Sequence, residues 1–315
     1  MTQVDRLLTT DRPFLTDGGL ETWLFFQQGF EAPLFAAIML MDDDPARQAM
    51  RDYFDGFLAM AESARTGFVL DTVTWRGCTE WAPKLGVSEA ELLRLSTEAV
   101  RFAAGIRDAW QSRVPAILIN GVVGPAGDGY APGQLPTPAR AYAMHSPQIR
   151  ALAETGADMI SAITMTNIGE AIGIVRAARA VDLPVVVSFT VETDGRLPTG
   201  DLLADAIGAV DEATGNVPAY YMVNCAHPDH FRDTIADGSD WTARIGGLRA
   251  NASRLSHAEL DVAEELDDGD PEEFGRLHSQ LARFLPNLRV LGGCCGTDHR
   301  HVGCISQHVH EKPAA

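Results

Sequence analysis

Short apolar runs alternate with longer amphipathic stretches along the whole chain. The apolar runs are rich in Val, Ile and Leu, which is typical of strands that are buried on both faces of a parallel sheet. Eight runs of this kind predict strands at 14–19, 67–75, 115–124, 157–165, 184–191, 219–226, 244–252 and 288–296. Stretches with apolar residues at helical spacing predict helices at 45–65, 88–110, 146–156, 167–181 and 271–285.

This alternation predicts an α/β fold, a (β/α)8 TIM barrel that occupies residues 1–315 as a single domain. A doubly wound sheet is the alternative, but it usually has fewer strands and a G-x-G-x-x-G loop after the first strand. The first strand here runs into "DGGLET" (17–22), which lacks that form and favours the barrel. Barrel enzymes place the active site at the C-terminal ends of their strands, so a Gly- and Pro-rich loop at 124–138 is expected to border it.

The composition argues against two classes of binding partner. The chain carries 25 basic and 43 acidic residues, a formal net charge of -18, which argues against binding to nucleic acid or to anionic membranes. The first residues contain no apolar signal segment, and no apolar run is long enough to span a bilayer. The five cysteines are an odd number and thinly spread, which fits a reducing compartment. We therefore expect a cytoplasmic protein, and the sequence leaves a homo-oligomer open.

Polar side chains recur where the apolar runs stop. The residues at the expected strand ends are Asp17, Asp71, Thr72, Asn120, Thr164, Thr190, Glu192, Asn224, Cys225, Asn251, Ser253, Cys294 and Cys295. Most of these positions need no explanation beyond the end of a strand. The exception is that three of the five cysteines lie at the ends of strands six and eight.

The three cysteines suggest a metal site. Adjacent residues of a regular strand point to opposite faces, so Cys294 and Cys295 can converge only if the glycines around them let the chain turn. Three thiolates, with Cys225 as the third, suit tetrahedral zinc and leave one coordination position open for catalysis. Buried apolar cysteines and a redox-active vicinal pair are the alternatives that the spacing leaves open.

Several motifs resemble one known family. "VNCAHPDH" (223–230), "GLRANAS" (247–253) and "LGGCCGTDHRHV" (291–302), together with "DGGLET" and "FTVETDGRLPTG" (189–200), are similar to the homocysteine S-methyltransferase family from about residue 11 to 310. The resemblance implies a (β/α)8 barrel with Zn2+ bound by Cys225, Cys294 and Cys295, and a part in methionine biosynthesis. It also implies that an acceptor thiol binds the zinc as a thiolate and attacks the methyl carbon of a donor.

The resemblance also implies a substrate site at the same strand ends. The expected substrate-binding residues are Asp17, Gly18, Gly19, Asp71, Thr72, Glu192, Asn224 and Asn251. One position departs from the family, in which a glutamate at the end of the fourth strand binds the amino group of homocysteine. Ile163 stands there, and no acid is near it on that strand. Either Glu192, with Asp17, replaces the missing acid, or the acceptor is a thiol without an ammonium group.

The donor is expected to be a small sulfonium or betaine compound, with a separate corrinoid protein as the alternative. Aromatic residues that follow strands one and two can hold an onium methyl group or can simply pack under the loops. They are Trp23, Phe25, Phe26, Trp75 and Trp81. A non-enzymatic alternative is a redox sensor that loses zinc when its vicinal thiols are oxidised.

Overall fold

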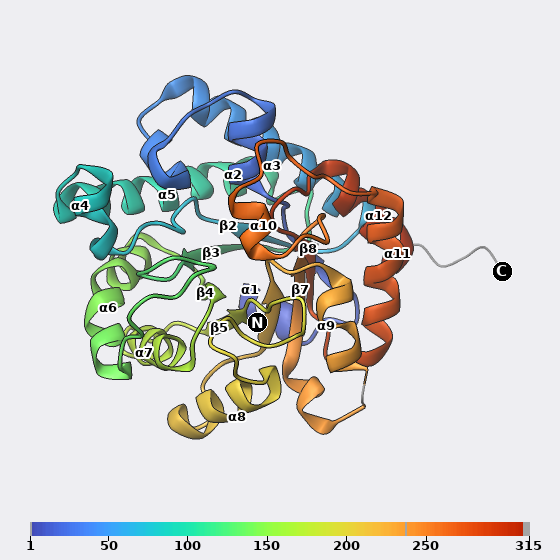
Figure 1. Cartoon of the computed structure of the whole chain (residues 1–315). Helices are drawn as coiled ribbons and strands as arrows, with labels where there is room; N and C mark the ends of the chain where they lie inside the picture. Colours follow the sequence, from blue (N-terminus) through green and yellow to red (C-terminus); the bar gives the residue numbers. More distant parts are fainter. Residues whose placement is uncertain (1, 237, 311–315) are drawn as a thin grey trace.

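The eight expected strands form one closed parallel barrel in the computed structural model, which describes residues 2–236 and 238–310 (Figure 1). Each strand pairs with its neighbours in chain order, and β1 closes the barrel against β8. The strands are β1 Phe14–Leu15, β2 Phe68–Asp71, β3 Ile117–Val123, β4 Met159–Met165, β5 Val185–Phe189, β6 Tyr221–Asn224, β7 Ile245–Ala250 and β8 Val290–Gly293. Each strand falls inside its expected run, and the predicted (β/α)8 fold is confirmed.

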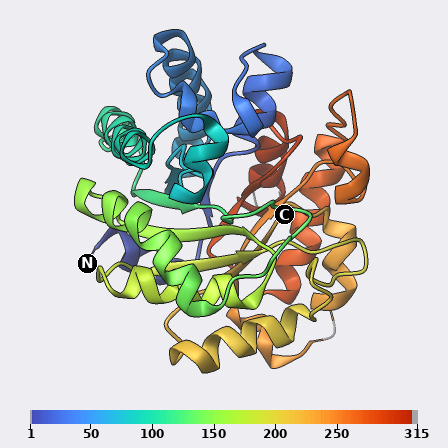
Figure 2. The ribbon, with the colours of Figure 1, turned by 60° about the vertical axis from the view of Figure 1, so that its left-hand side comes forward.

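Helices surround the strands and form the outer layer (Figures 1 and 2). They are α1 Gln3–Leu8, α2 Leu20–Thr22, α3 Asp44–Ala64, α4 Ala82–Leu85, α5 Glu89–Trp110, α6 Pro138–Thr155, α7 Ile168–Arg179, α8 Leu203–Thr214, α9 Pro228–Ile235, α10 His257–Asp261, α11 Pro271–Leu281 and α12 His299–His310. Within the described ranges, no helix has both the length and the apolar character that a membrane span requires.

Four of the five predicted helices match α3, α5, α7 and α11, but the helix expected at 146–156 is wrong at its start. α6 begins eight residues earlier, at Pro138, because the Thr137 side chain accepts a hydrogen bond from the backbone N–H of Arg140 (3.3 Å) and caps the first turn. Pro147, the second residue of the predicted helix, lies inside α6. α8 and α12 were not predicted.

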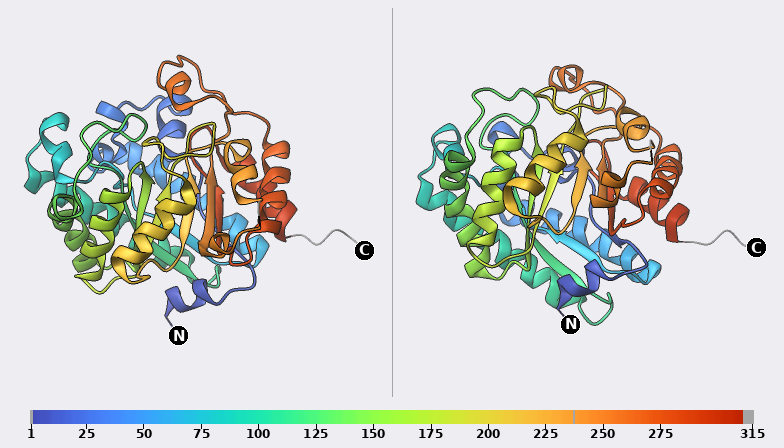
Figure 3. Two further views of the ribbon diagram at one scale, coloured as in Figure 1. Left: turned by 60° about the horizontal axis from the view of Figure 1, so that its bottom comes forward. Right: turned by 90° about the horizontal axis from the view of Figure 1, so that it is seen from below.

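The two ends of the barrel are built differently (Figure 3). α1 covers the N-terminal ends of the strands, where the Arg6 guanidinium donates a hydrogen bond to the Pro115 carbonyl (2.8 Å). An apolar cluster that includes Val69, Leu118 and Val186 fills the interior below the opposite end. That opposite end carries α2, α10 and the loop after β3, and it is left with room for a ligand.

Candidate active site

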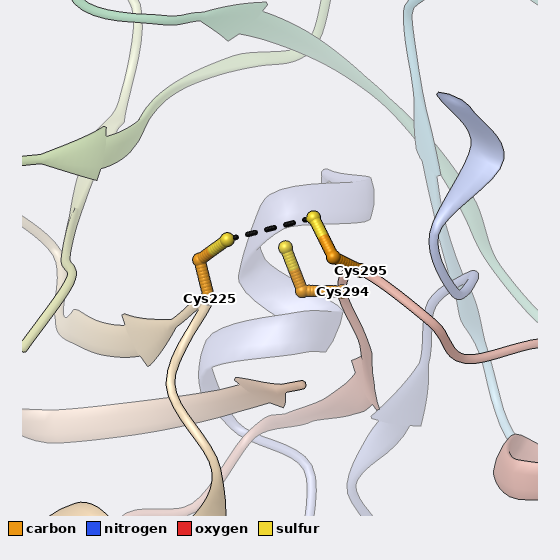
Figure 4. A group of neighbouring side chains, drawn as sticks. All are labelled: Cys225, Cys294 and Cys295. Atoms are coloured by element: carbon orange, nitrogen blue, oxygen red, sulfur yellow. Dashed lines mark hydrogen bonds between the residues drawn. The ribbon is translucent and has the colours of Figure 1, made fainter. Parts of the chain in front are cut away.

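Three thiols converge at the C-terminal end of the barrel (Figure 4). Cys225 directly follows β6, and Cys294 and Cys295 directly follow β8. Their three sulfur atoms all lie within 4.8 Å of one another, and the Sγ atoms of Cys225 and Cys295 are 3.6 Å apart. The structure therefore brings together the three cysteines that the sequence singled out.

Backbone turns make this convergence possible. Cys225 has a left-handed conformation (φ +57°), which interrupts the alternation of side chains at the end of β6. After β8 the chain enters a tight turn in which the N–H of Thr297 donates to the carbonyl of Cys294 (3.1 Å), with Gly296 at φ +76°. Adjacent thiols can share one side because they lie in this turn and not in the strand.

The thiol cluster fits a zinc ion. Zinc–sulfur bonds of about 2.3 Å in a tetrahedron place the sulfurs about 3.8 Å apart, close to the 3.6 Å between Cys225 and Cys295. Without a metal, hydrogen bonds donated by the other two thiols hold the pKa of Cys294 well below its ordinary value, whereas the pKa of Cys225, which donates to those thiols, lies well above its ordinary value. The cluster can therefore carry three negative charges only when a cation compensates them.

A cavity of about 340 Å³ opens above the sulfurs, which is the size of a site for small metabolites. Most of the expected substrate-binding residues line it together with the three cysteines: Asp17, Gly18, Gly19, Asp71, Thr72 and Asn251. The side chains of Asn224 and Glu192 lie outside its wall.

Asn224 and Glu192 lie behind the residues that line the cavity. The amide nitrogen of Asn224 lies 2.8 Å from the hydroxyl of Thr164 and 3.8 Å from the Sγ of Cys294, so this side chain holds a sulfur in place. The carboxylate of Glu192 accepts a hydrogen bond from Nδ1 of His257 (3.0 Å), whose Nε2 lies 2.8 Å from the carbonyl oxygen of Cys225. Both residues support the sulfur cluster, and neither is placed to contact a ligand in the cavity.

Asp17 and Asp71 share one buried guanidinium. Arg249 of β7 forms ion pairs with Asp71 and with Asp17 (2.6 Å) and donates to the carbonyl of Gly293 (3.2 Å). Burial opposes the charge of Arg249, but the two carboxylates raise the pKa of its guanidinium. Sequence reasoning missed Arg249, although a charged residue within an apolar run was a signal for it. The group ties the ends of β1, β2, β7 and β8 together below the cavity.

The two glycines after Asp17 let the backbone pack closely against the cysteine turn. A Cβ on Gly18 would lie 2.7 Å from the Thr297 carbonyl oxygen, and one on Gly19 would lie 2.5 Å from the Cys294 carbonyl oxygen. The segment after β1 therefore rests directly on the cysteine turn, as only glycine allows. Among the predicted contacts, Asn251 is the one with a free atom, since its buried Oδ1 has no hydrogen-bond partner among the described residues.

The loop after β3 contributes Tyr130, which sequence reasoning also missed. Its hydroxyl lies 3.1 Å from the Sγ of Cys225 and 3.6 Å from the Sγ of Cys295. Its ring stacks on His257 with the centroids 4.2 Å apart. The predicted role of this loop as a wall of the site is consistent with the contact, but no pattern in the loop identified the tyrosine.

Only part of the aromatic cluster reaches the cavity. Phe26 and Trp75 line it, whereas Trp23 packs on Tyr53 with the ring centroids 5.0 Å apart. Trp81 is buried and donates to the carbonyl of Pro125 (2.9 Å). The cluster thus serves both packing and the cavity wall.

A parallel barrel with three convergent thiols at the C-terminal ends of its strands is a scaffold on which cysteines can hold a metal ion, and comparison with known proteins identifies the family. A model of the family described as homocysteine S-methyltransferase matches residues 14–309. The curated homocysteine S-methyltransferase YbgG of Bacillus subtilis is 25% identical over 325 residues, 96% of each chain. Homocysteine S-methyltransferase 3 of Arabidopsis thaliana is 24% identical over 174 residues, 54% of this chain and 49% of that protein.

Solved structures share the fold. The metallated form of the homocysteine methyltransferase MmuM from Escherichia coli superposes with a TM-score of 0.72 at 19% identity, over 97% of this chain and 99% of that one. The apo form of MmuM gives a TM-score of 0.67 at 18% identity, over 98% of this chain and 100% of that one. The chain belongs to the homocysteine S-methyltransferase family, and it is a thiol S-methyltransferase.

Proposed function

We propose that this enzyme binds one zinc ion through Cys225, Cys294 and Cys295 and moves a methyl group from a small onium donor to the thiol of homocysteine. The observation that supports the proposal is the convergence of three thiols within 4.8 Å at the floor of a cavity of about 340 Å³. Three sulfur ligands leave one tetrahedral position free on the cavity side. Zinc bound there would lower the pKa of an acceptor thiol, which is otherwise near 8.5.

The protein's own groups orient the two substrates. Asn224 and the Arg249 group fix the cysteine turn from below, and Asn251, which lines the cavity, has a buried Oδ1 without a hydrogen-bond partner among the described residues. Tyr130 and Trp75 offer aromatic faces that suit the positive charge of a sulfonium or betaine methyl group. Holding donor and acceptor in line can remove roughly 7–11 kcal/mol of the barrier to methyl transfer.

The metal set is tested by zinc content. The purified protein should carry about one zinc per chain, and Cys225→Ser should lose most of the zinc and the methyl transfer while the barrel remains folded. Cys304→Ser is the matched control because Cys304 lies on α12, away from the cavity. Atomic absorption and circular dichroism measure both properties, and full zinc in Cys225→Ser would contradict the assignment.

The same preparation separates the proposed enzyme from the alternatives. Transfer of a labelled methyl group from a sulfonium or betaine compound to homocysteine, with no second protein present, supports the diffusible donor. Transfer that occurs only when a methylated corrinoid protein is added replaces it. Zinc release by peroxide without any methyl transfer indicates a redox sensor. We further propose a cytoplasmic location, since the thiol ligands must remain reduced.

A further inference from the structure

One partly buried carboxylate in the cavity wall has no partner among the described residues. Seven acidic residues line the cavity: Asp17, Glu21, Asp71, Asp128, Asp261, Glu265 and Asp267. Asp17 and Asp71 are paired with Arg249, while Asp128 and Asp267 accept hydrogen bonds from nearby N–H and hydroxyl groups. Asp261 and Glu265 are exposed to solvent. Glu21 is partly buried, and its carboxylate makes no hydrogen bond or ion pair with any other residue in the described ranges.

The basic residues of the wall do not neutralise Glu21. Arg249 is occupied by the two aspartates, and Arg76 packs against the rings of Trp75 and Trp81. Neither guanidinium forms an ion pair with Glu21, and burial raises the pKa of Glu21 to about 7. A buried carboxylate without a partner is costly unless a ligand supplies the cation.

Glu21 is held next to the sulfur cluster. It lies in α2, whose preceding residue Gly19 donates its N–H to the Thr297 carbonyl (2.9 Å), and the hydroxyl of Thr22 accepts from the N–H of Gly296 (3.1 Å). These bonds clamp the α2 segment onto the turn that carries Cys294 and Cys295. A cation bound by Glu21 would therefore lie in the same cavity as the thiols.

The opposite wall lacks an acid. Ile163 of β4, at the position where the family resemblance implies a glutamate, lines the same cavity with an apolar side chain. Homocysteine has its ammonium three carbons from the sulfur, so with its thiol at the cluster it needs an anionic partner close to the cysteine turn. Glu21 meets that requirement, and the carboxylate of Glu192 is turned to His257.

We propose that Glu21 binds the α-ammonium of an amino-acid thiol acceptor and so replaces, from the segment after β1, the acid that β4 lacks at Ile163. This inference rests on the proposed function, and it deepens that function by naming the residue that recognises the amino group of the acceptor. It makes Glu21 a specificity-determining residue, because a thiol without the ammonium gains nothing from it.

The test compares two thiols that differ only in the ammonium. Binding of homocysteine and of 4-sulfanylbutanoate, its deaminated analogue, is measured by calorimetry on the zinc-loaded protein, and KM is measured for each thiol. Glu21→Gln should weaken homocysteine binding about 10- to 100-fold, as expected for one charge-assisted hydrogen bond, and should leave the deaminated thiol nearly unchanged. Glu264→Gln, at an exposed site outside the cavity, is the control and should change neither.

A second variant tests whether an acid on β4 restores the preference for homocysteine. Ile163→Glu added to Glu21→Gln should restore most of the preference for homocysteine, because it returns an acid to the opposite wall of the same cavity. Zinc content and thermal unfolding of each variant show that the site is intact, and Glu21→Asp should retain part of the preference.

Different results would contradict the role of Glu21 and the proposed function. Equal weakening of both thiols by Glu21→Gln, or a change confined to the KM of the methyl donor, would overturn the role of Glu21 and leave the proposed function standing. A wild-type protein that carries zinc but binds neither thiol would overturn the proposed function itself.

Discussion

Arg249 is a charged side chain inside a buried strand, and it is stable there because two carboxylates surround it. Its guanidinium pairs with Asp17 and Asp71, and the amide of Asn120 donates to Asp71 (2.7 Å). A buried ion group of this kind contributes little net stability compared with apolar packing, but losing one partner is costly. The group therefore fixes the geometry of the strand ends more than it stabilises the barrel.

Replacing Arg249 should reveal how much stability is lost when its two carboxylates have no partner. Arg249→Met leaves two buried carboxylates without a cation and should lower the free energy of unfolding by about 3–5 kcal/mol. Arg113→Met, which breaks an exposed pair with Glu62, is the control and should cost much less. Urea unfolding of both variants measures the difference, and equal losses would show that the buried group is no more important than a surface pair.

The sequence identifies some residues of the site and hides others. The three cysteines were predictable because a thiol at a strand end is rare, whereas a polar residue there is common. Arg249 was hidden within an apolar run, since only the folded barrel shows which carboxylates it meets. Tyr130 and Glu21 were hidden because their roles depend on how a loop and a short helix fold back over the strands.

At the scale of elements, the site depends on the contact between the segment after β1 and the turn after β8. Gly19 lies where a Cβ would be 2.5 Å from both the Cys294 carbonyl oxygen and the Thr22 hydroxyl. Contacts this short force the backbone to move. The packing of these two segments therefore sets the position of Cys294 and Cys295.

Replacing each of two glycines with alanine should change the stability of the protein in opposite directions. Gly19→Ala should destabilise the protein by about 1–3 kcal/mol and lower its zinc affinity, because the cysteine turn must shift. Gly105→Ala, inside α5 with no atom within 4 Å of the new Cβ, should instead stabilise it by about 0.5–1 kcal/mol. Thermal unfolding and a competitive zinc titration measure both. Unchanged zinc affinity in Gly19→Ala would contradict the role of this contact.

The pattern of apolar runs was enough to predict the strands, because strands buried on both faces are continuously apolar. It was less reliable for helix boundaries. The dipeptide Ser146–Pro147 resembles a helix start, yet it lies within α6 because Thr137 caps the helix earlier. α8 was missed although its buried residues Leu203, Ala206, Ile207 and Val210 follow helical spacing.

On the scale of the whole molecule, the site exists only when the barrel is closed. Its cysteines come from β6 and β8, and β8 is held in register by the pairing of Phe14 with Val290 and Leu15 with Leu291. Zinc bound at the proposed site of the folded chain would therefore stabilise the entire barrel. For this reason global stability has to be compared at a fixed zinc concentration.

A second buried ion pair links helices on the far side of the sulfur cluster. Nε2 of His145 in α6 lies 2.9 Å from the Glu170 carboxylate in α7, and that carboxylate also accepts from the N–H of Ala126 (2.8 Å) and the amide of Asn167 (3.2 Å). Burial opposes the charged imidazole, but Cys78 and Glu170 raise the pKa of His145 to about 9.

This raised pKa predicts how global stability depends on pH. Because the folded pKa of about 9 lies above the ordinary value of 6.5, the stabilisation is complete below pH 6.5 and is lost as the pH rises through 9. The loss amounts to as much as about 3 kcal/mol. Urea unfolding of the zinc-loaded wild type and of His145→Gln between these pH values isolates this contribution, since the zinc site is common to both proteins. The stability difference between them should shrink steadily with increasing pH, and a constant difference would show that His145 is neutral in the folded barrel.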